Sequence, residues 1–322
     1  MSIAPILKEI GRGREGARHM SQAQAEAVFA QVLRGEVSGI ELGAFCAAMR
    51  IKGETAEEMA GFLAATAQVQ RESGLRLQAA SLMPVVLPSY NGSRRLPTLT
   101  PLLALLLQQQ GVPVLVHGMA TEDGRVHAFE VFAQLGHHPS ASDAALQSGE
   151  LRLMDTSALN PGLARLLNVR RVMGLRNSAH SLVKLMNPFE DRALLVGSYT
   201  HPEYAVSMRA VFERIKANAV LLRGTEGEPV ADPRRAVALD AFDEGVHARL
   251  QDAASGVVIE LPELPSADAA ATARWTLGVL NGEHAVPAPV LLQVQQLVAW
   301  RQRLLARAPL AVPVFNPQAE CA

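Results

Sequence analysis

The sequence changes pattern near residue 75, and this change is what most constrains the fold. Before it, only helix signals occur: Ser21 and Thr55 suit helix N-caps, and Glu58 completes a capping box with Thr55. Apolar residues recur at helical spacing, for example at positions 25, 28, 29, 32 and 33. We therefore predict helices over residues 2–10, 21–34 and 40–51 and after residue 55, forming a helical N-terminal subdomain over residues 1–75.

From residue 76 onward, short apolar runs alternate with helix patterns. The runs at 85–87, 112–117, 151–154, 193–197 and 219–222 are typical of buried strands. Thr100 and Pro101 open a leucine-rich helix that Gly111 ends, and further helices are predicted over 271–281 and 289–306. This alternation indicates a larger α/β domain with a mostly parallel sheet, spanning residues 76–322.

The net charge of the chain is close to zero, so it gives no support for a strongly charged binding partner. Lys and Arg number 30 and Asp and Glu number 31, so a case for nucleic acid must rest on where the charges lie. The two cysteines are far apart and form no CxxC pair, which favours a reduced, cytoplasmic protein without a zinc site. The longest apolar run, residues 102–107, is far shorter than the ~20 residues of a membrane span, so we expect no membrane association.

The chain lacks the familiar catalytic signatures. The sequence has no Walker loop, no GxGxxG after a strand, no nucleophile elbow and no HExxH helix. We therefore expect no resident cofactor or metal, and no catalytic residues of these classes.

Four segments in order carry a resemblance to a known family. They are residues 111–118 (Gly-Val-Pro-Val-Leu-Val-His-Gly), 168–176 (Asn-Val-Arg-Arg-Val-Met-Gly-Leu-Arg), 182–188 ending in Asn-Pro, and 222–227 (Leu-Arg-Gly-Thr-Glu-Gly). Together they resemble the anthranilate phosphoribosyltransferase and nucleoside phosphorylase fold over nearly the whole chain. The resemblance implies that helices within residues 161–188 rejoin the N-terminal helical subdomain.

A second set of segments is more specific. They are residues 9–13 (Glu-Ile-Gly-Arg-Gly), 50–54 (Arg-Ile-Lys-Gly-Glu), 88–92 (Pro-Ser-Tyr-Asn-Gly), 176–180 (Arg-Asn-Ser-Ala-His), 201–204 (His-Pro-Glu-Tyr) and 224–228 (Gly-Thr-Glu-Gly-Glu). They resemble the YbiB group of this fold, which is known as dimeric DNA- and RNA-binding proteins without transferase activity. The resemblance implies a homodimer that binds nucleic acid, with the helical subdomain as the dimer interface.

The same alignment of motifs implies that the family's chemistry has been lost. The enzymes cradle pyrophosphate with a Gly-Thr-Gly-Gly-Asp loop, where this chain has Pro88-Ser89-Tyr90-Asn91-Gly92; proline has no N–H to donate. The family's Asp-Glu pair for magnesium is replaced by Pro229 and Val230, and magnesium rarely binds without carboxylates. Two alternatives stay open: an active phosphoribosyltransferase with an altered substrate, and a scaffold for a protein partner.

Two acid-free stretches support nucleic acid. Residues 73–121 and 161–188 contain no Asp or Glu but several Arg and Lys, and the resemblance places both stretches at the family's cleft. A cleft lined by charge of one sign attracts polyanions. We therefore expect sequence-independent binding of single-stranded DNA or RNA in a basic groove.

The candidate contacts are a possible stacking ring and a set of basic and polar residues. Tyr90 is a possible stacking ring beside Arg94 and Arg95, and Arg209 and Lys216, seven residues apart, are expected to share a helix face. Ordinary surface pairing is the alternative for the cations, with Glu213 the nearest partner of Arg209 and Lys216. The full set is Arg12, Arg14, Arg18, Arg50, Lys52, Tyr90, Asn91, Arg94, Arg95, Arg170, Arg171, Arg176, Lys184, Arg209 and Lys216.

Overall fold

The computed structural model describes residues 2–79, 82–190, 192–256 and 263–306. Its N-terminal part consists of the helices α1 (Ala4–Ile10), α2 (Gly13–Gly16), α3 (Gln22–Arg34), α4 (Gly39–Lys52) and α5 (Ala56–Glu72). Ser21, Ser38 and Thr55 each form a capping box with the residue three positions on, which fixes where α3, α4 and α5 begin. The predicted helices are confirmed, and the short α2 lies between the first two of them.

Aromatic packing holds the helical part together. The rings of Phe29 and Phe62 stack with centroids 4.4 Å apart, and Phe45 meets Phe62 edge-on at 6.1 Å. Helices α3 and α5 approach closely at Gly61, where a Cβ atom would lie 2.4 Å from the carbonyl oxygen of Gln22. A side chain at position 61 would therefore separate the two helices.

The rest of the chain is built on a seven-stranded sheet with the strand order β3-β2-β1-β4-β5-β6-β7. The strands are β1 (Val85–Ser89), β2 (Val114–Gly118), β3 (Leu151–Asp155), β4 (Leu194–Tyr199), β5 (Ala219–Arg223), β6 (Leu239–Asp243) and β7 (Val246–Gln251). The first five are parallel, and β6 and β7 continue the sheet as an antiparallel hairpin. The predicted mostly parallel sheet is confirmed.

The β6–β7 hairpin is absent from the sequence prediction. Its two-residue turn is Glu244-Gly245, with φ of 49° and 83°. Paired positive φ angles suit the twist of a tight hairpin, but a non-glycine residue rarely adopts one. The exposed strand β7 also mixes polar with apolar residues, so neither strand stands out in the sequence.

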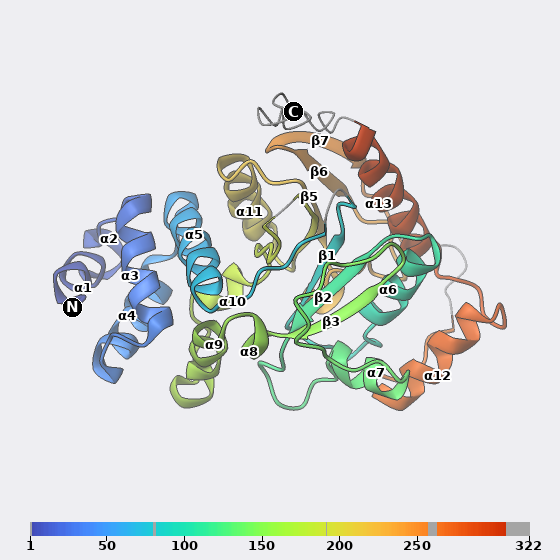
Figure 1. Ribbon diagram of the computed structural model, residues 1–322, viewed down its shortest axis with the longest axis horizontal. Coiled ribbons are helices and arrows are strands. Elements are labelled where there is room, and N and C mark those ends of the chain that lie inside the picture. The colour runs from blue at the N-terminus through green and yellow to red at the C-terminus, as the bar shows by residue number, and fades with distance from the viewer. Residues whose placement is uncertain (1, 80–81, 191, 257–262, 307–322) are drawn as a thin grey trace, which may run out of the picture.

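Helices cover both faces of the sheet (Figure 1). On one face, Val85 and Leu87 pack with α6 (Thr100–Gln109), α7 (Ala128–Gln134), α12 (Ala269–Leu280) and α13 (Ala288–Ala306). On the other face, Val86 belongs to a core shared with the N-terminal helices and with α8 (Thr156–Leu159), α9 (Pro161–Met173), α10 (Ala179–Leu182) and α11 (Pro202–Arg214). Within the described ranges, no helix is long and apolar enough to cross a bilayer.

Helix α9 lies directly against α3. A Cβ atom at Gly162 would lie 1.9 Å from the carbonyl oxygen of Leu33, and Arg165 donates hydrogen bonds to the carbonyls of Val32 and Leu33 at 2.9 and 3.1 Å. Residues that follow β3 in the sequence thus pack on the N-terminal helices. This packing brings α9 and α10 to the carboxyl ends of the parallel strands, where the candidate site lies.

Candidate functional site

The loop after β1 is held by a carboxylate from the segment after β5, a strand that lies two positions from β1 in the sheet. Glu228 is fully buried and accepts the backbone N–H groups of Asn91 at 2.8 Å and Gly92 at 2.9 Å. Its other oxygen accepts the hydroxyls of Thr100, at 3.1 Å, and Ser89. Four donors thus satisfy one buried carboxylate, as a buried charge requires. The loop amides that would face a bound anion already have an acceptor inside the protein.

A second carboxylate repeats this arrangement one turn along the loop. Glu226 accepts the backbone N–H groups of Arg94, Arg95 and Leu96 at 3.0, 2.8 and 2.9 Å. Burial opposes its ionisation, but these N–H donors outweigh burial and hold the pKa of Glu226 below its usual range. Glu226 and Glu228 belong to the turn formed by η1 (Thr225–Gly227) and the residue after it. This turn therefore fixes the whole segment between β1 and α6.

Two polar residues from the predicted set join the same turn. Asn91 donates its side-chain amide to the carbonyl of Glu226 at 2.9 Å, and Lys184 donates Nζ to the carbonyl of Gly227 at 2.9 Å. Burial lowers the pKa of Lys184 to about 8. Both side chains act here as internal connections between three segments that are distant in the sequence.

Tyr90 points into the core and cannot stack with a base. It is 3% exposed, its hydroxyl lies 2.8 Å from Nδ1 of His117, and Thr156 donates to that hydroxyl at 3.0 Å. Burial lowers the pKa of His117 to about 3, so the imidazole is neutral. The prediction of a stacking platform at Tyr90 is therefore wrong, because its hydroxyl is paired inside the protein.

Arginines gather around Glu122, in the loop after β2. Arg125, Arg170 and Arg176 all form ion pairs with this one carboxylate, the last at 3.2 Å. Burial raises the pKa of Glu122, but Arg170, Arg125 and Arg176 together lower it to about 2. Arg125 also reaches Glu226 at 3.5 Å, which connects this cluster to the β1–α6 loop.

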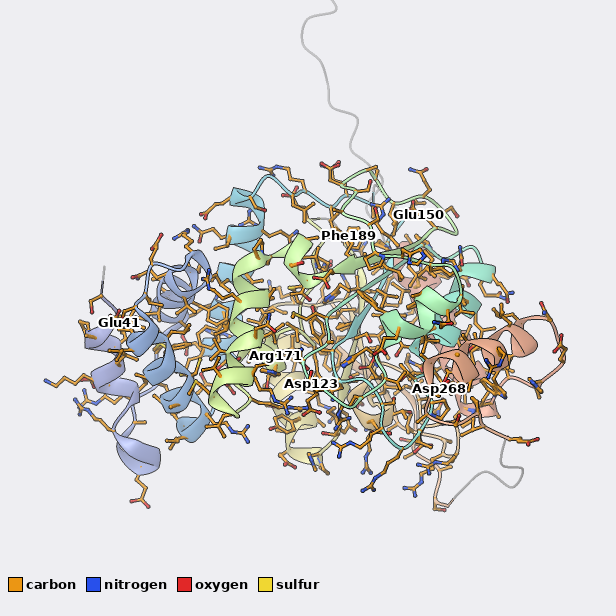
Figure 2. The ribbon with its side chains drawn as sticks, turned by 90° about the horizontal axis from the view of Figure 1, so that it is seen from below. Glu41, Asp123, Glu150, Arg171, Phe189 and Asp268 are labelled. Carbon is orange, nitrogen blue, oxygen red and sulfur yellow. The ribbon has the colours of Figure 1, made fainter. Side chains whose placement is uncertain are left out.

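The arginines outnumber the acids that pair with them. Arg171 pairs with Asp123 at 3.4 Å, and the two lie close together near the middle of the view in Figure 2. Arg94 and Arg95 are exposed, and the described residues offer their side chains no hydrogen bond or ion pair. We call this set the cationic rim: Arg94, Arg95, Arg125, Arg170, Arg171 and Arg176. Against its six guanidinium groups stand the three carboxylates of Glu122, Asp123 and Glu226, which leaves three positive charges in surplus.

Sequence reasoning placed acid-free stretches here and missed both Glu122 and Arg125. The first stretch ends at Thr121, one residue before Glu122, so the acid that organises the cluster fell just outside it. The pattern Glu-Asp-Gly-Arg at 122–125, shortly after a buried strand, is the signal that could have revealed both residues. The expectation of a cleft with one sign of charge is therefore replaced by a mixed cluster with a cationic surplus.

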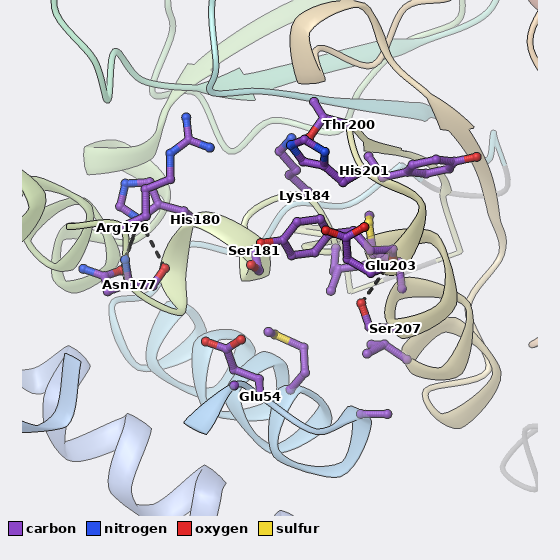
Figure 3. Close-up of a pocket in the computed structure, with 18 of the residues that line it drawn as sticks. Glu54, Arg176, Asn177, His180, Ser181, Lys184, Thr200, His201, Glu203 and Ser207 are labelled. Carbon is purple, nitrogen blue, oxygen red and sulfur yellow. Dashed lines mark hydrogen bonds between the residues drawn. The ribbon is translucent and has the colours of Figure 1, made fainter. Parts of the chain in front are cut away.

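A pocket of about 460 Å³ opens beside the rim (Figure 3). It lies between the end of α4, the start of α5, α10, and the start of α11. The structure brings together here four residues of the predicted set: Arg50, Asn91, Arg176 and Lys184. Arg176 lines the pocket and also belongs to the rim, so the two features are continuous.

Comparison with known proteins identifies the family. Residues 4–69 match the helical bundle domain of the glycosyl transferase family. The chain is 39% identical to the uncharacterized protein YbiB of Escherichia coli over 303 residues, which cover 91% of this chain and 92% of that protein. This chain belongs to the YbiB-type branch of the anthranilate phosphoribosyltransferase superfamily. It is also 30% identical to the anthranilate phosphoribosyltransferase of Deinococcus radiodurans over 237 residues, which cover 71% of this chain and 65% of the enzyme.

Solved structures of the superfamily share the fold. The anthranilate phosphoribosyltransferase of Thermus thermophilus superposes with a TM-score of 0.67 at 20% identity, over 94% of this chain and 98% of the enzyme. The enzyme of Saccharomyces cerevisiae in complex with PRPP and Mg gives a TM-score of 0.69 at 14% identity, over 93% and 88%. At these identities the likeness concerns the fold alone.

The YbiB-type chain does not offer a magnesium site at the position of the enzymes' Asp-Glu pair. Val230 is completely buried, and the carbonyl of Pro229 accepts a hydrogen bond from Gln293 at 2.9 Å. The neighbouring carboxylates, Glu226 and Glu228, already hold loop N–H groups. Among the described residues, no group of three or more His, Cys, Asp and Glu is placed to bind a metal ion.

Of the predicted residues in the N-terminal helices and their loops, Arg50 lines the pocket, whereas Arg12, Arg18 and Lys52 belong neither to the pocket nor to the rim. Arg12 pairs with Glu9 at 2.6 Å, and Arg18 approaches the same carboxylate at 3.5 Å. The side chain of Arg14 lies outside the described part of the structure. Lys52 is 1% exposed and pairs with the buried Glu58 at 2.6 Å, so it links α4 to α5 and is withdrawn from the candidate contacts.

Arg209 and Lys216 do not share a helix face. Helix α11 ends at Arg214, and Lys216 lies beyond it with a left-handed φ of 52°. Arg209 pairs with the buried Asp240 on β6, which also holds His247 at 2.7 Å and Arg249 at 3.1 Å. Sequence reasoning offered Glu213 as the partner of Arg209, because the strand that carries Asp240 was not predicted.

Proposed function

We propose that this protein binds single-stranded DNA or RNA along the cationic rim, without sequence preference and without transferase chemistry. The observation that carries the proposal is the surplus of three positive charges among partly exposed arginines at the carboxyl edge of the sheet. Guanidinium groups bind phosphate oxygens through two parallel hydrogen bonds, so arginine is suited to a phosphate backbone. The resemblance to the YbiB group supports the same function.

The pairing inside the rim does not remove its attraction for a polyanion. Glu122 takes part in three ion pairs at once, so each arginine keeps donors that the carboxylate does not use. Ion pairs also hold the side chains in place before binding, which reduces the entropy lost when phosphates arrive. The rim is therefore organised for binding, although it is not free of acids.

The transferase alternative meets an obstacle in the same site. Phosphate loops bind their ligands through backbone N–H groups, and here Glu228 and Glu226 accept those of Asn91, Gly92, Arg94, Arg95 and Leu96. A phosphoribosyl pyrophosphate molecule would have to displace two internal carboxylates and bind without magnesium ligands. This arrangement supports binding through side chains on the rim.

A homodimer formed through α4 is part of the proposal. Ile40 and Ile51 are 87% and 61% exposed, and Ala44 and Ala47 lie between them at helical spacing. An exposed apolar stripe on one helix is suited to burial against a second copy. A dimer would double the number of rims on one particle. The buried free thiol of Cys46 on this helix fits the reduced, cytoplasmic setting that we propose.

Fluorescence anisotropy of a labelled single-stranded oligonucleotide, repeated at several salt concentrations, tests the function. We expect binding whose log K falls with log salt by roughly 0.7 for each phosphate that the protein neutralises, over several phosphates. No binding at low salt would refute the proposal, and phosphoribosyl pyrophosphate with magnesium would then be the next titrant.

A further inference from the structure

Two of the three tyrosines of this chain line the pocket beside the cationic rim. The sequence has three tyrosines: Tyr90 is buried, and the other two, Tyr199 and Tyr204, both line the pocket. Tyr204 is 42% exposed, and its ring lies 6.4 Å from that of His201, another lining residue. Only 4% of the residues in this protein are aromatic, so a cluster of rings at one pocket is a distinctive feature. Flat rings at a pocket mouth suit a planar ligand.

Another part of the pocket wall carries a buried polar atom that has no partner among the described residues. His180 lines the pocket, and its Nδ1 lies 3.3 Å from the backbone nitrogen and oxygen of Asn177. Its Nε2 is buried, and the described residues provide no hydrogen-bond partner for it. Burial and the nearby Arg176 lower the pKa of His180 to about 4, so the ring is neutral. A neutral imidazole nitrogen can donate or accept one hydrogen bond, so a polar group that enters the pocket beside His180 could supply the missing partner.

The remaining lining residues of the pocket supply both apolar surface and polar groups. Met59, Met208 and Val211 supply apolar surface, while Ser181 and Thr200 contribute hydroxyls. Arg176 also belongs to the cationic rim, Arg50 is exposed, and two carboxylates, Glu54 and Glu203, line the pocket as well (Figure 3). A flat polar ring could donate hydrogen bonds to the carboxylates, and an attached phosphate could bind the two arginines. The volume of about 460 Å³ lies within the usual range of ~300–1,000 Å³ for small-ligand sites.

We propose that the pocket takes one nucleobase from the bound strand, with Tyr204 at its mouth as the stacking ring and with the flanking phosphates on the cationic rim. This inference rests on the proposed function and adds to it a single site for a base. Because every base has a flat face, one stacking site is compatible with binding that ignores sequence. The stacking role that sequence reasoning gave to Tyr90 would thus belong to Tyr204.

The test compares two strands of equal length and charge: an oligothymidylate and the same backbone made entirely of abasic sites. Both are titrated by anisotropy against the wild type, Tyr204→Ala and the matched control Tyr204→Phe, which keeps the ring. Stacking on one aromatic side chain predicts that the wild type prefers the strand with bases by roughly fivefold to a hundredfold. Tyr204→Phe should keep this preference and Tyr204→Ala should lose most of it, with the salt dependence of binding unchanged.

The outcomes separate the two proposals. If the wild type binds both strands equally, or if Tyr204→Ala keeps the full preference, the base pocket is refuted while salt-dependent binding of both strands still supports the rim. If neither strand binds at low salt, both proposals are refuted. Because Tyr204 is partly exposed, its substitution should leave the thermal midpoint nearly unchanged, which excludes unfolding as the cause of a reduced preference.

Discussion

The carboxylate of Glu228 accepts the backbone N–H of Gly92 at 2.9 Å, although 136 residues separate the two in the chain. Loops at the carboxyl ends of parallel strands are common anion sites, because their N–H groups converge there. In this protein the anion is a side chain of the same molecule. The interaction both stabilises the loop and occupies the groups that would otherwise bind phosphate.

Removing this carboxylate should create an anion site. In Glu228→Ala, the N–H groups of Asn91 and Gly92 and two hydroxyls lose their acceptor, so we expect the protein to be destabilised by about 2–4 kcal/mol. Inorganic phosphate should then raise the thermal midpoint of the variant but not of the wild type, because the freed donors and Lys184 can hold it.

Glu228→Gln is the matched control for this experiment. Its amide oxygen can still accept hydrogen bonds from the loop, so we expect a smaller loss of stability and little response to phosphate. Equal phosphate responses in the wild type and in Glu228→Ala would show that the carboxylate does not occupy an anion site.

Glu122→Gln should strengthen nucleic-acid binding while weakening the fold. Loss of this carboxylate raises the surplus on the rim from three positive charges to four, so affinity for a single strand should increase several-fold at low salt. The unfolding free energy at pH 7 should fall by about 1–3 kcal/mol, because Arg170 and Arg176 lose their carboxylate partner and Arg125 keeps only Glu226. Unchanged affinity would mean that the strand does not touch the Glu122 cluster.

The same substitution has a defined pH dependence. The pKa of Glu122 is lowered to about 2 in the folded protein, so its contribution to stability is complete above the ordinary carboxyl pKa and is lost as pH falls toward 2. The stability difference between wild type and Glu122→Gln, measured by urea unfolding, should therefore shrink below about pH 4.5. A difference that stays constant down to pH 3 would contradict the ion-pair account.

His117 should make the protein sensitive to mild acid. Burial lowers its pKa to about 3, so the unfolded chain takes up a proton first and stability is lost as pH falls from about 6.5 toward 3. At pH 5 this single group should cost about 1–2 kcal/mol relative to pH 7. Urea unfolding of His117→Gln at both pH values should show a correspondingly smaller loss, whereas equal losses would show that His117 does not contribute.

The exposed stripe on α4 predicts a change of oligomeric state. Ile40→Glu combined with Ile51→Glu should convert a particle of two chains into a single chain of 34.5 kDa, as measured by light scattering during gel filtration. Val246→Glu is the matched control, since Val246 is 71% exposed on β7, away from this helix. A wild type that elutes as a monomer would refute the dimer.

Local signals in the sequence were sufficient for most of the fold. Ser21 and Thr55 marked helix starts because their side chains cap the neighbouring backbone, and the runs around Val85 and Val114 marked strands because both faces of the sheet are buried. The β6–β7 hairpin was missed. Its turn needs a positive φ at Glu244, and glutamate is not a residue that predicts this conformation.

The site was harder to predict because its partners are distant in the sequence. The family resemblance placed Arg94 and Arg170 at the cleft, but nothing local in the sequence indicates that Glu226 holds the loop of Arg94 or that Glu122 holds Arg170. Tyr90 was misassigned for the same reason, since its burial depends on His117 and Thr156.

The central claim is tested most directly by changing only the charge of the rim. Arg94 and Arg95 are held by their backbone N–H groups, so the pair of substitutions Arg94→Glu and Arg95→Glu should leave the loop intact. Arg71→Glu, at the exposed C-terminal end of α5, is the matched control.

Anisotropy of a single-stranded oligonucleotide is measured against salt for the three proteins. We predict tight, salt-dependent binding by the wild type and Arg71→Glu. For the rim variant we predict an affinity at least tenfold lower, with a salt slope reduced by roughly 0.7 for each phosphate that is no longer neutralised. Identical slopes and affinities for all three proteins, or no binding by the wild type at low salt, would contradict the account.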